Sequence, residues 1–147
     1  MRQFLGPSPV MQRDGRRATI GYTVVAVLVA LAMFVAAAGA GPEQATTDRS
    51  LPDWFHAGAN ALAIVYGVLV LIPRTRALGA LLAVANMFLS MYVNHEFGGV
   101  EFFVDAIAYN TVTIMLGSIL VGHYLEDLAG LVAPLVGNTD QPIPEAE

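Results

Sequence analysis

The sequence predicts an all-α integral membrane protein: a four-helix bundle that runs up-down-up-down and ends in a short C-terminal interfacial helix. Its 147 residues are 56% hydrophobic and 13% charged, whereas soluble domains have roughly 45–50% and 25%. Its apolar segments are close to the roughly 20 residues that cross a bilayer. We expect one domain, with a basic leader at 1–17, four membrane helices in 18–124, and an interfacial segment and disordered acidic tail at 125–147.

The first membrane helix is expected at 18–40, where no residue is charged. As a helix this run rises about 35 Å, enough to cross the membrane with some tilt. The alternative is a cleaved signal peptide, because Ala38, Gly39 and Ala40 form a small-residue site. The apolar run is longer than the usual signal core of roughly 7–15 residues, which favours a retained helix and leaves cleavage open.

Three further helices are expected at 54–72, 77–95 and 102–124. Trp54 opens the first of them, as aromatic residues do at membrane interfaces. The segment that follows the last helix alternates acidic and apolar residues over 125–136 and is too short to cross the membrane, so it should lie at the interface. Pro7 and Pro9 oppose a long helix in the leader, which should be disordered or lie on the surface.

The arginines predict the orientation of these helices. With four crossings, the leader and the turn at 73–76 share one side and hold six of the seven arginines, and Arg49 stands alone on the other. Short loops rich in Lys and Arg remain in the cytoplasm. We therefore expect a multi-pass protein of the cell membrane with both termini in the cytoplasm.

The composition excludes several kinds of chemistry. The chain has no cysteine, which rules out disulfides and thiolate metal ligands within it. Its net charge is −5 without a basic run, which argues against nucleic-acid binding. No HxxxH or ExxH spacing is present, so no metal site is predicted, and any metal would need ligands from separate helices.

Polar residues recur at every fourth position along three of the predicted helices. Residues four apart stack on one face of a helix, so each helix carries a single polar stripe. Lipid offers these groups no hydrogen-bond partner, and the stripes should therefore turn inward and face one another. They comprise His56 and Asn60; Asn86, Ser90 and Asn94; and Glu101, Asp105, Tyr109 and Thr113.

In the predicted topology these stripes meet near the outer membrane surface and form a candidate site. A carboxylate beside an imidazole can relay protons, hydrogen-bond a quinol hydroxyl or help to bind a metal. Asp105 lies one turn inside its helix, where an ionisable group needs a functional reason. The candidate ligand or proton-relay residues are Asp105, Glu101, His95, His56, Asn60, Asn94 and Tyr109.

A purely structural role is the alternative for much of this set. Asn and Ser stripes commonly join membrane helices, at about 0.6 kcal/mol for each hydrogen bond. His95 and Glu96 fall in a turn that should face water, where charge is ordinary. The inner half of the bundle is expected to be plainer, with Tyr66 in the core, His123 at the interface and small residues for close packing, namely Gly67, Gly79 and Gly117.

The segment GVLVLIPRTRALGALLAVANMFLSMYVNH, residues 67–95, resembles the central hairpin of the DoxX-like family of small four-helix membrane proteins. In that family a Gly-containing apolar helix ends in a Pro/Arg turn, and a helix rich in Leu, Ala and Met ends in His. The number and lengths of the helices also fit over about 18–124. The matching positions are Gly67, Pro73, Arg74, Arg76, Met87, Met91 and His95.

This resemblance implies a role in quinone-linked or redox-stress chemistry beside a membrane partner. Members of the family are similar to a small subunit of a thiosulfate:quinone oxidoreductase. The family often has Gly and Lys near the end of its first helix and Glu in its second. This chain has 37–40 as Ala-Ala-Gly-Ala and 63–64 as Ala-Ile at those places. His95 is the one site position that the resemblance transfers.

Three functional hypotheses follow from the sequence. The first is an accessory or quinone-interacting subunit of a membrane redox system, not an enzyme on its own, with a quinone as candidate cofactor. The second is a structural or assembly subunit without a site, and the third is a small transporter or channel protomer. In each case the partners are the lipid bilayer and either another membrane subunit or further copies of the chain. The sequence leaves the ligand, the partner and the oligomeric state open.

Overall fold

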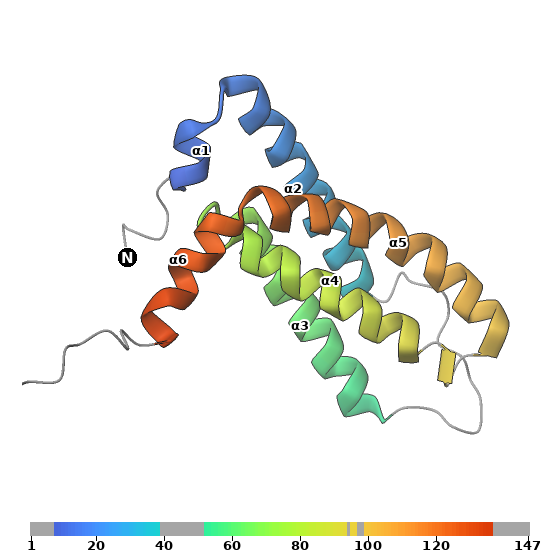
Figure 1. Cartoon of the computed structure of the whole chain (residues 1–147). Helices are drawn as coiled ribbons and strands as arrows, with labels where there is room; N and C mark the ends of the chain where they lie inside the picture. Colours follow the sequence, from blue (N-terminus) through green and yellow to red (C-terminus); the bar gives the residue numbers. More distant parts are fainter. Residues whose placement is uncertain (1–7, 39–51, 94, 97–98, 137–147) are drawn as a thin grey trace, which may run out of the picture.

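A computed structural model describes residues 8–38, 52–93, 95–96 and 99–136, with side chains except at 53, 56, 99–106 and 134–136. Within those ranges the chain is helical and contains no strand (Figure 1). All-α structure is therefore confirmed for the part of the chain that is described. The helices are α1 (Pro9–Arg13), α2 (Arg16–Ala37), α3 (Asp53–Leu71), α4 (Arg76–Val93), α5 (Gly99–His123) and α6 (Leu125–Val136).

The four long helices, α2 to α5, begin and end within three residues of the predicted boundaries. By length and composition, α2 and α4 can each cross a membrane, and α5 qualifies when joined to α6, from which it is bent by 67°. The described apolar stretch of α3, Ala57–Leu71, is shorter than a full crossing. Two or three candidate crossings are thus present, and the four-span up-down bundle stays a prediction.

Helix α5 runs antiparallel to both α4 and α2. Along α5, Asn110 bonds to Met87 of α4, and Gly117 lies against Val84, an earlier residue of the same helix. The same reversal holds against α2, where Tyr109 contacts Ala32 and His123 stacks on Tyr22. Figure 1 shows α2, α4 and α5 extending side by side from the end at which α1 and α6 lie.

Three glycines bring neighbouring helices into close contact. A Cβ added at Gly79 would lie 2.5 Å from the backbone nitrogen of Val70, and one at Gly117 would lie 2.7 Å from Val84 Cγ2. At Gly67 the added atom would come within 2.6 Å of the ring of Phe34. The prediction that these small residues permit close packing is confirmed.

Small side chains are frequent in the core. Among the described residues, six of the 13 buried apolar side chains are alanines, and these are Ala26, Ala30, Ala63, Ala77, Ala80 and Ala83. Many large apolar side chains point outward instead, among them Leu28, Leu31, Leu62, Val65, Phe88, Leu89, Met115 and Ile119. Small residues inside and large apolar residues outside are typical of helices that pack in lipid.

The described part of the predicted leader, residues 8–17, contacts the rest of the protein. Ser8 and Val10 are buried, and Pro9 occupies the first turn of α1, where a missing N–H costs nothing. The Ser8 hydroxyl oxygen accepts a hydrogen bond from the Met11 N–H at 3.1 Å and caps the helix. From residue 8 onward the leader therefore packs against the rest of the protein.

Candidate functional site

Most of the predicted outer site cannot be placed. The side chains of His56, Glu101 and Asp105 lie outside the described part of the chain, as does the whole of Asn94. The backbone puts His56 in α3 and both acids in the first two turns of α5. The convergence of these residues therefore stays a prediction.

Three members of the predicted site have described side chains, and they lie in different settings. His95 is exposed, and its Nδ1 lies 3.1 Å from Oε1 of the adjacent Glu96, as expected of a water-facing turn. Asn60 is half-buried in α3. Tyr109 is half-buried in α5 and reaches across to α2.

The polar stripe of α5 does turn inward at its described positions. The Tyr109 hydroxyl donates a hydrogen bond to the Ala32 carbonyl at 2.6 Å, and the buried Thr113 hydroxyl donates to the Tyr109 carbonyl at 3.5 Å. Asn110, which the stripe does not include, is buried as well, and its amide donates to the Met87 carbonyl at 3.3 Å. The inward orientation is confirmed for Tyr109 and Thr113.

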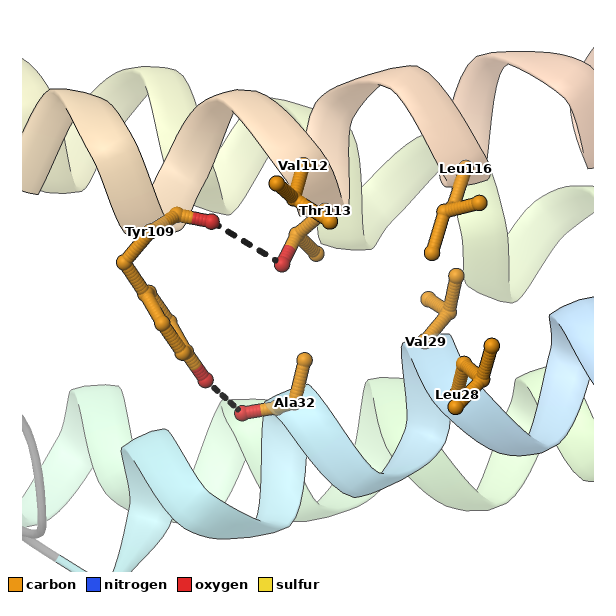
Figure 2. A pocket seen from close by; sticks show the side chains of 7 residues that line it. All are labelled: Leu28, Val29, Ala32, Tyr109, Val112, Thr113 and Leu116. Carbon is orange, nitrogen blue, oxygen red and sulfur yellow. Dashed lines mark hydrogen bonds between the residues drawn. The ribbon is translucent and has the colours of Figure 1, made fainter.

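Between α2 and α5 lies an apolar groove of about 340 Å³ (Figure 2). Two of the residues that line the groove, Tyr109 and Thr113, carry hydroxyl groups, and both hydroxyls donate hydrogen bonds to backbone carbonyls. Small-molecule sites typically occupy about 300–1,000 Å³ and combine apolar walls with a few polar groups. The lining residues are Leu28, Val29, Ala32, Tyr109, Val112, Thr113 and Leu116. Such a groove suits an apolar molecule that carries one hydrogen-bonding group.

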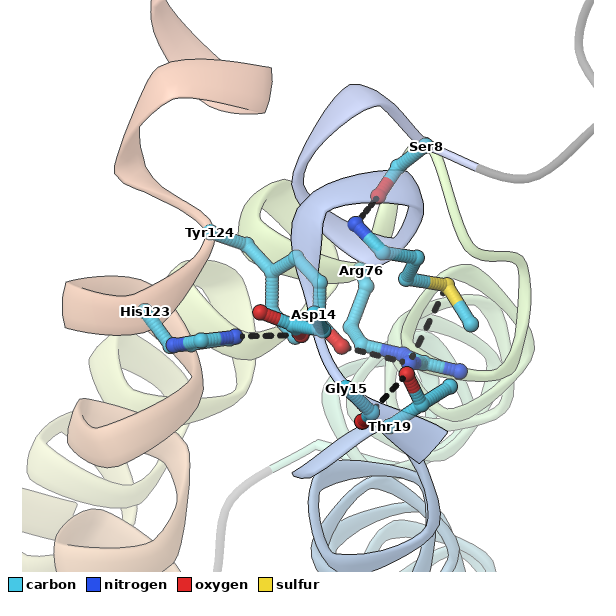
Figure 3. Close-up of polar contacts among 8 residues, drawn as sticks. Ser8, Asp14, Gly15, Thr19, Arg76, His123 and Tyr124 are labelled. Carbon is cyan, nitrogen blue, oxygen red and sulfur yellow. Dashed lines mark hydrogen bonds and ion pairs between the residues drawn. The ribbon is translucent and has the colours of Figure 1, made fainter. Parts of the chain in front are cut away.

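A second polar cluster lies where α1, the 72–75 turn and the start of α6 meet (Figure 3). This end of the helices, predicted to face the cytoplasm, is called the inner end. The centre of the cluster is Arg76, which is only 3% exposed. The guanidinium donates from Nε to the Val70 carbonyl at 3.2 Å and from Nη1 to the Tyr124 hydroxyl at 3.1 Å. The Met11 sulfur lies 3.8 Å from Nη1, so α1 covers the arginine. The leader and the arginine turn therefore lie at the same end of the helices, and the side of the membrane on which they lie stays a prediction.

His123 joins α1 to the end of α5 in the same cluster. Its Nε2 lies 2.9 Å from Asp14 Oδ2, and its ring stacks on Tyr22 at 3.5 Å between centroids. The neighbouring Tyr124 is fully buried and meets the His123 ring edge-on. This cluster lies at the ends of the helices, and the expectation of a plainer inner half within the bundle stays a prediction. Polar residues that are isolated along the chain converge there from several elements, and no spacing within one helix reveals them.

Charged groups of α1 and α6 complete the inner cluster. Arg13 forms an ion pair with Glu126 and donates a hydrogen bond to its carboxylate, and this bond, followed by the charge of the carboxylate, raises the pKa of Arg13. Asp127 is 8% exposed, and neither of its carboxylate oxygens has a hydrogen-bond partner among the described residues. The cluster thus contains a buried carboxylate and a buried guanidinium that do not bond to each other.

The turn between α3 and α4 explains why Arg76 lies inside. The last carbonyls of a helix need donors from elsewhere. The Thr75 hydroxyl donates to the Leu69 carbonyl at 2.9 Å, and Arg76 serves the Val70 carbonyl in the same way. The basic turn at 73–76 therefore also caps α3, a role that the sequence analysis did not predict. One feature of the sequence could have predicted this cluster. In the predicted topology the leader, the turn and residues 123–127 lie at the same end of the helices, and together they carry charges of both signs.

Comparisons with protein-family models, with curated proteins and with solved structures gave no match to this chain. Among the described side chains, no group of three His, Asp or Glu residues could hold a metal ion.

Proposed function

We propose that this chain is a small four-span membrane protein that binds a quinone in the groove between α2 and α5, as an accessory subunit of a membrane redox system. The cell membrane would be its location, with both termini in the cytoplasm. The observation that carries the proposal is the apolar groove with the Tyr109 hydroxyl at its edge.

The outer surface of the helices supports insertion in a bilayer. Val112 and Met115 of α5 are 58% and 62% exposed, and the long helices carry many other large apolar side chains in the same position. In water each such side chain would forgo about 1.5–3 kcal/mol of burial. In hydrocarbon the cost disappears, and the small residues of the core then bring the backbones together.

The groove matches the two parts of a quinone. An isoprenoid tail needs apolar walls, which Leu28, Val29 and Leu116 provide. A quinol hydroxyl can donate a hydrogen bond to the Tyr109 hydroxyl oxygen, whose own hydrogen is donated to the Ala32 carbonyl. A quinone carbonyl would instead need the Tyr109 hydroxyl to turn its hydrogen away from Ala32. The likeness of 67–95 to the DoxX-like family favours the same ligand class. Asp105 precedes Tyr109 by four residues, so by helical periodicity it would extend the polar edge of the groove toward the outer surface.

Photolabelling tests the proposal directly. The full chain, reconstituted in liposomes, is illuminated with an azido-quinol that carries an isoprenoid tail, and the labelled peptides are mapped by mass spectrometry. We expect the label on α2 and α5, with roughly fivefold less on Tyr109→Phe, because the loss of one hydrogen bond costs about 1 kcal/mol.

A filled groove provides the matched comparison. Ala32→Leu adds three carbon atoms to the lining of the groove and should abolish most of the labelling. Ala61→Leu makes the same change at an exposed position of α3 and should leave it unchanged. Labelling spread evenly over all helices, or unaffected by Ala32→Leu, would contradict the quinone site and favour a structural subunit.

A further inference from the structure

Both hydroxyl groups in the lining of the groove between α2 and α5 already donate their hydrogens to the protein. The Tyr109 hydroxyl donates to the Ala32 carbonyl at 2.6 Å, and the Thr113 hydroxyl donates to the Tyr109 carbonyl at 3.5 Å. Figure 2 shows the Tyr109 ring reaching from α5 toward α2, where its hydroxyl meets Ala32. A hydroxyl has one hydrogen and two lone pairs, so each of these oxygens can still accept a hydrogen bond.

Among the described residues that line the groove, no further hydrogen-bond donor is free. The other lining residues have apolar side chains. All of them lie beyond the first turn of α2 or α5, where backbone N–H groups bond to carbonyls of the same helix. The groove therefore presents hydrogen-bond acceptors to its ligand and no free donor.

We infer that the groove binds the reduced form of its ligand, a quinol, more tightly than the oxidised quinone. The inference rests on the proposed quinone site and adds the redox state of the occupant. A quinol hydroxyl donates to the Tyr109 oxygen and leaves the bond to Ala32 intact. A quinone carbonyl accepts from Tyr109 only after that bond is broken, so the bond gained offsets the bond lost. The quinol is thus ahead by one hydrogen bond, which corresponds to roughly fivefold in affinity.

A preference for the reduced form connects the groove with one class of reaction. Its ligand would be supplied by a partner that adds two electrons and two protons to a quinone, or consumed by a partner that removes them from the quinol. In either case Tyr109 holds the ligand by accepting its hydrogen bond.

Competition against the azido-quinol label tests the preference on the full chain in liposomes under argon. The competitors are a decyl-benzoquinol, the matching decyl-benzoquinone, and the dimethyl ether of the quinol, which keeps both oxygens but has no hydroxyl hydrogen. For the unmodified chain, the quinol should displace the label at a roughly fivefold lower concentration than either of the others. Equal potency of the three would overturn the inference and leave the proposed site standing. Label spread evenly over all helices would overturn both.

Tyr109→Phe removes the acceptor and should abolish the difference between the competitors. The quinol should bind roughly fivefold more weakly to this variant, whereas the quinone should bind as before. The matched control is Tyr66→Phe, which removes a tyrosine hydroxyl from α3, outside the lining of the groove. This variant should keep the preference. A preference that survives Tyr109→Phe, or that is lost equally in Tyr66→Phe, would overturn the inference.

Discussion

The outer and inner ends of the helices differ in how their polar residues are distributed along the chain. At the outer end, the predicted residues repeat every fourth position on single helices, and the spacing alone suggests a shared face. At the inner end, Asp14, Tyr22, Arg76 and His123 come one each from different segments, with no repeat between them. The comparison shows that the spacing of residues along a sequence can predict a polar stripe on one helix. A cluster that takes one residue from each of several elements can be recognised only in the folded structure.

One labelling experiment with an all-or-none result tests whether the two ends lie on opposite faces of the membrane. The chain has no cysteine, so Gln12→Cys and Glu96→Cys each introduce a single thiol at an exposed position. In intact cells an impermeant maleimide should label Glu96→Cys fully and Gln12→Cys only after permeabilisation. The reverse pattern would place the inner end outside the cell and contradict the predicted orientation.

Helices α3 and α4 pack closely at Gly79, whereas Gly58 near the other end of α3 faces open space, and substitutions at these two positions measure the difference. A Cβ at Gly79 would lie 2.5 Å and 2.7 Å from backbone atoms of Val70 and Leu69, which cannot move as a side chain can. We expect Gly79→Ala to lower the free energy of unfolding by about 3 kcal/mol. Thermal or SDS-induced unfolding of the purified protein in detergent provides the measurement.

Gly58, near the outer end of α3, is the control for that change. A Cβ there meets nothing within 4 Å, so Gly58→Ala should be neutral or stabilise the helix by up to about 1 kcal/mol. Equal effects of the two substitutions would mean that α3 and α4 do not approach each other as closely at Gly79 as the structure has them.

Removing the hydroxyl of Tyr124 or of Tyr109 compares how much one hydrogen bond stabilises the inner cluster and the groove. Tyr124→Phe would leave a donor of the buried Arg76 guanidinium without its partner and should cost about 2 kcal/mol. Tyr109→Phe removes a donor to the Ala32 carbonyl, which lies within α2 and is also within reach of helix N–H groups. It should cost about 1 kcal/mol. Chemical unfolding of both variants in the same detergent would test the order, and a larger loss for Tyr109→Phe would reverse it.

The sequence was sufficient for the helices and for part of the outer stripe. Long apolar runs with few charged residues predicted the positions of α2 to α5, because few other structures accommodate so many consecutive apolar residues. The four-residue spacing correctly predicted that Tyr109 and Thr113 face inward. The glycines Gly67, Gly79 and Gly117 correctly predicted close contacts between helices. Each of these predictions depends on information within a single helix.

The inner cluster could not be obtained in the same way. Arg76 reads as one of two surface arginines in a short turn, and only the position of Val70 and Tyr124 shows that it is buried. The groove was missed for a related reason. Its walls are ordinary apolar residues of α2 and α5, and the gap depends on the separation of two helices, which no residue of either one specifies.

The smallest expected difference between the two ends concerns their histidine–carboxylate pairs. The side chains of His123 and Asp14 are only 21% and 13% exposed, whereas those of His95 and Glu96 are 62% and 45% exposed. Water screens exposed pairs strongly, and many of them contribute nothing measurable. Double-mutant cycles with alanine should therefore give a coupling free energy of about 1 kcal/mol for Asp14 with His123. For His95 with Glu96 we expect less than about 0.5 kcal/mol. A coupling as small at the inner pair would mean that the contact between Asp14 and His123 adds no measurable stability where α1 meets the end of α5.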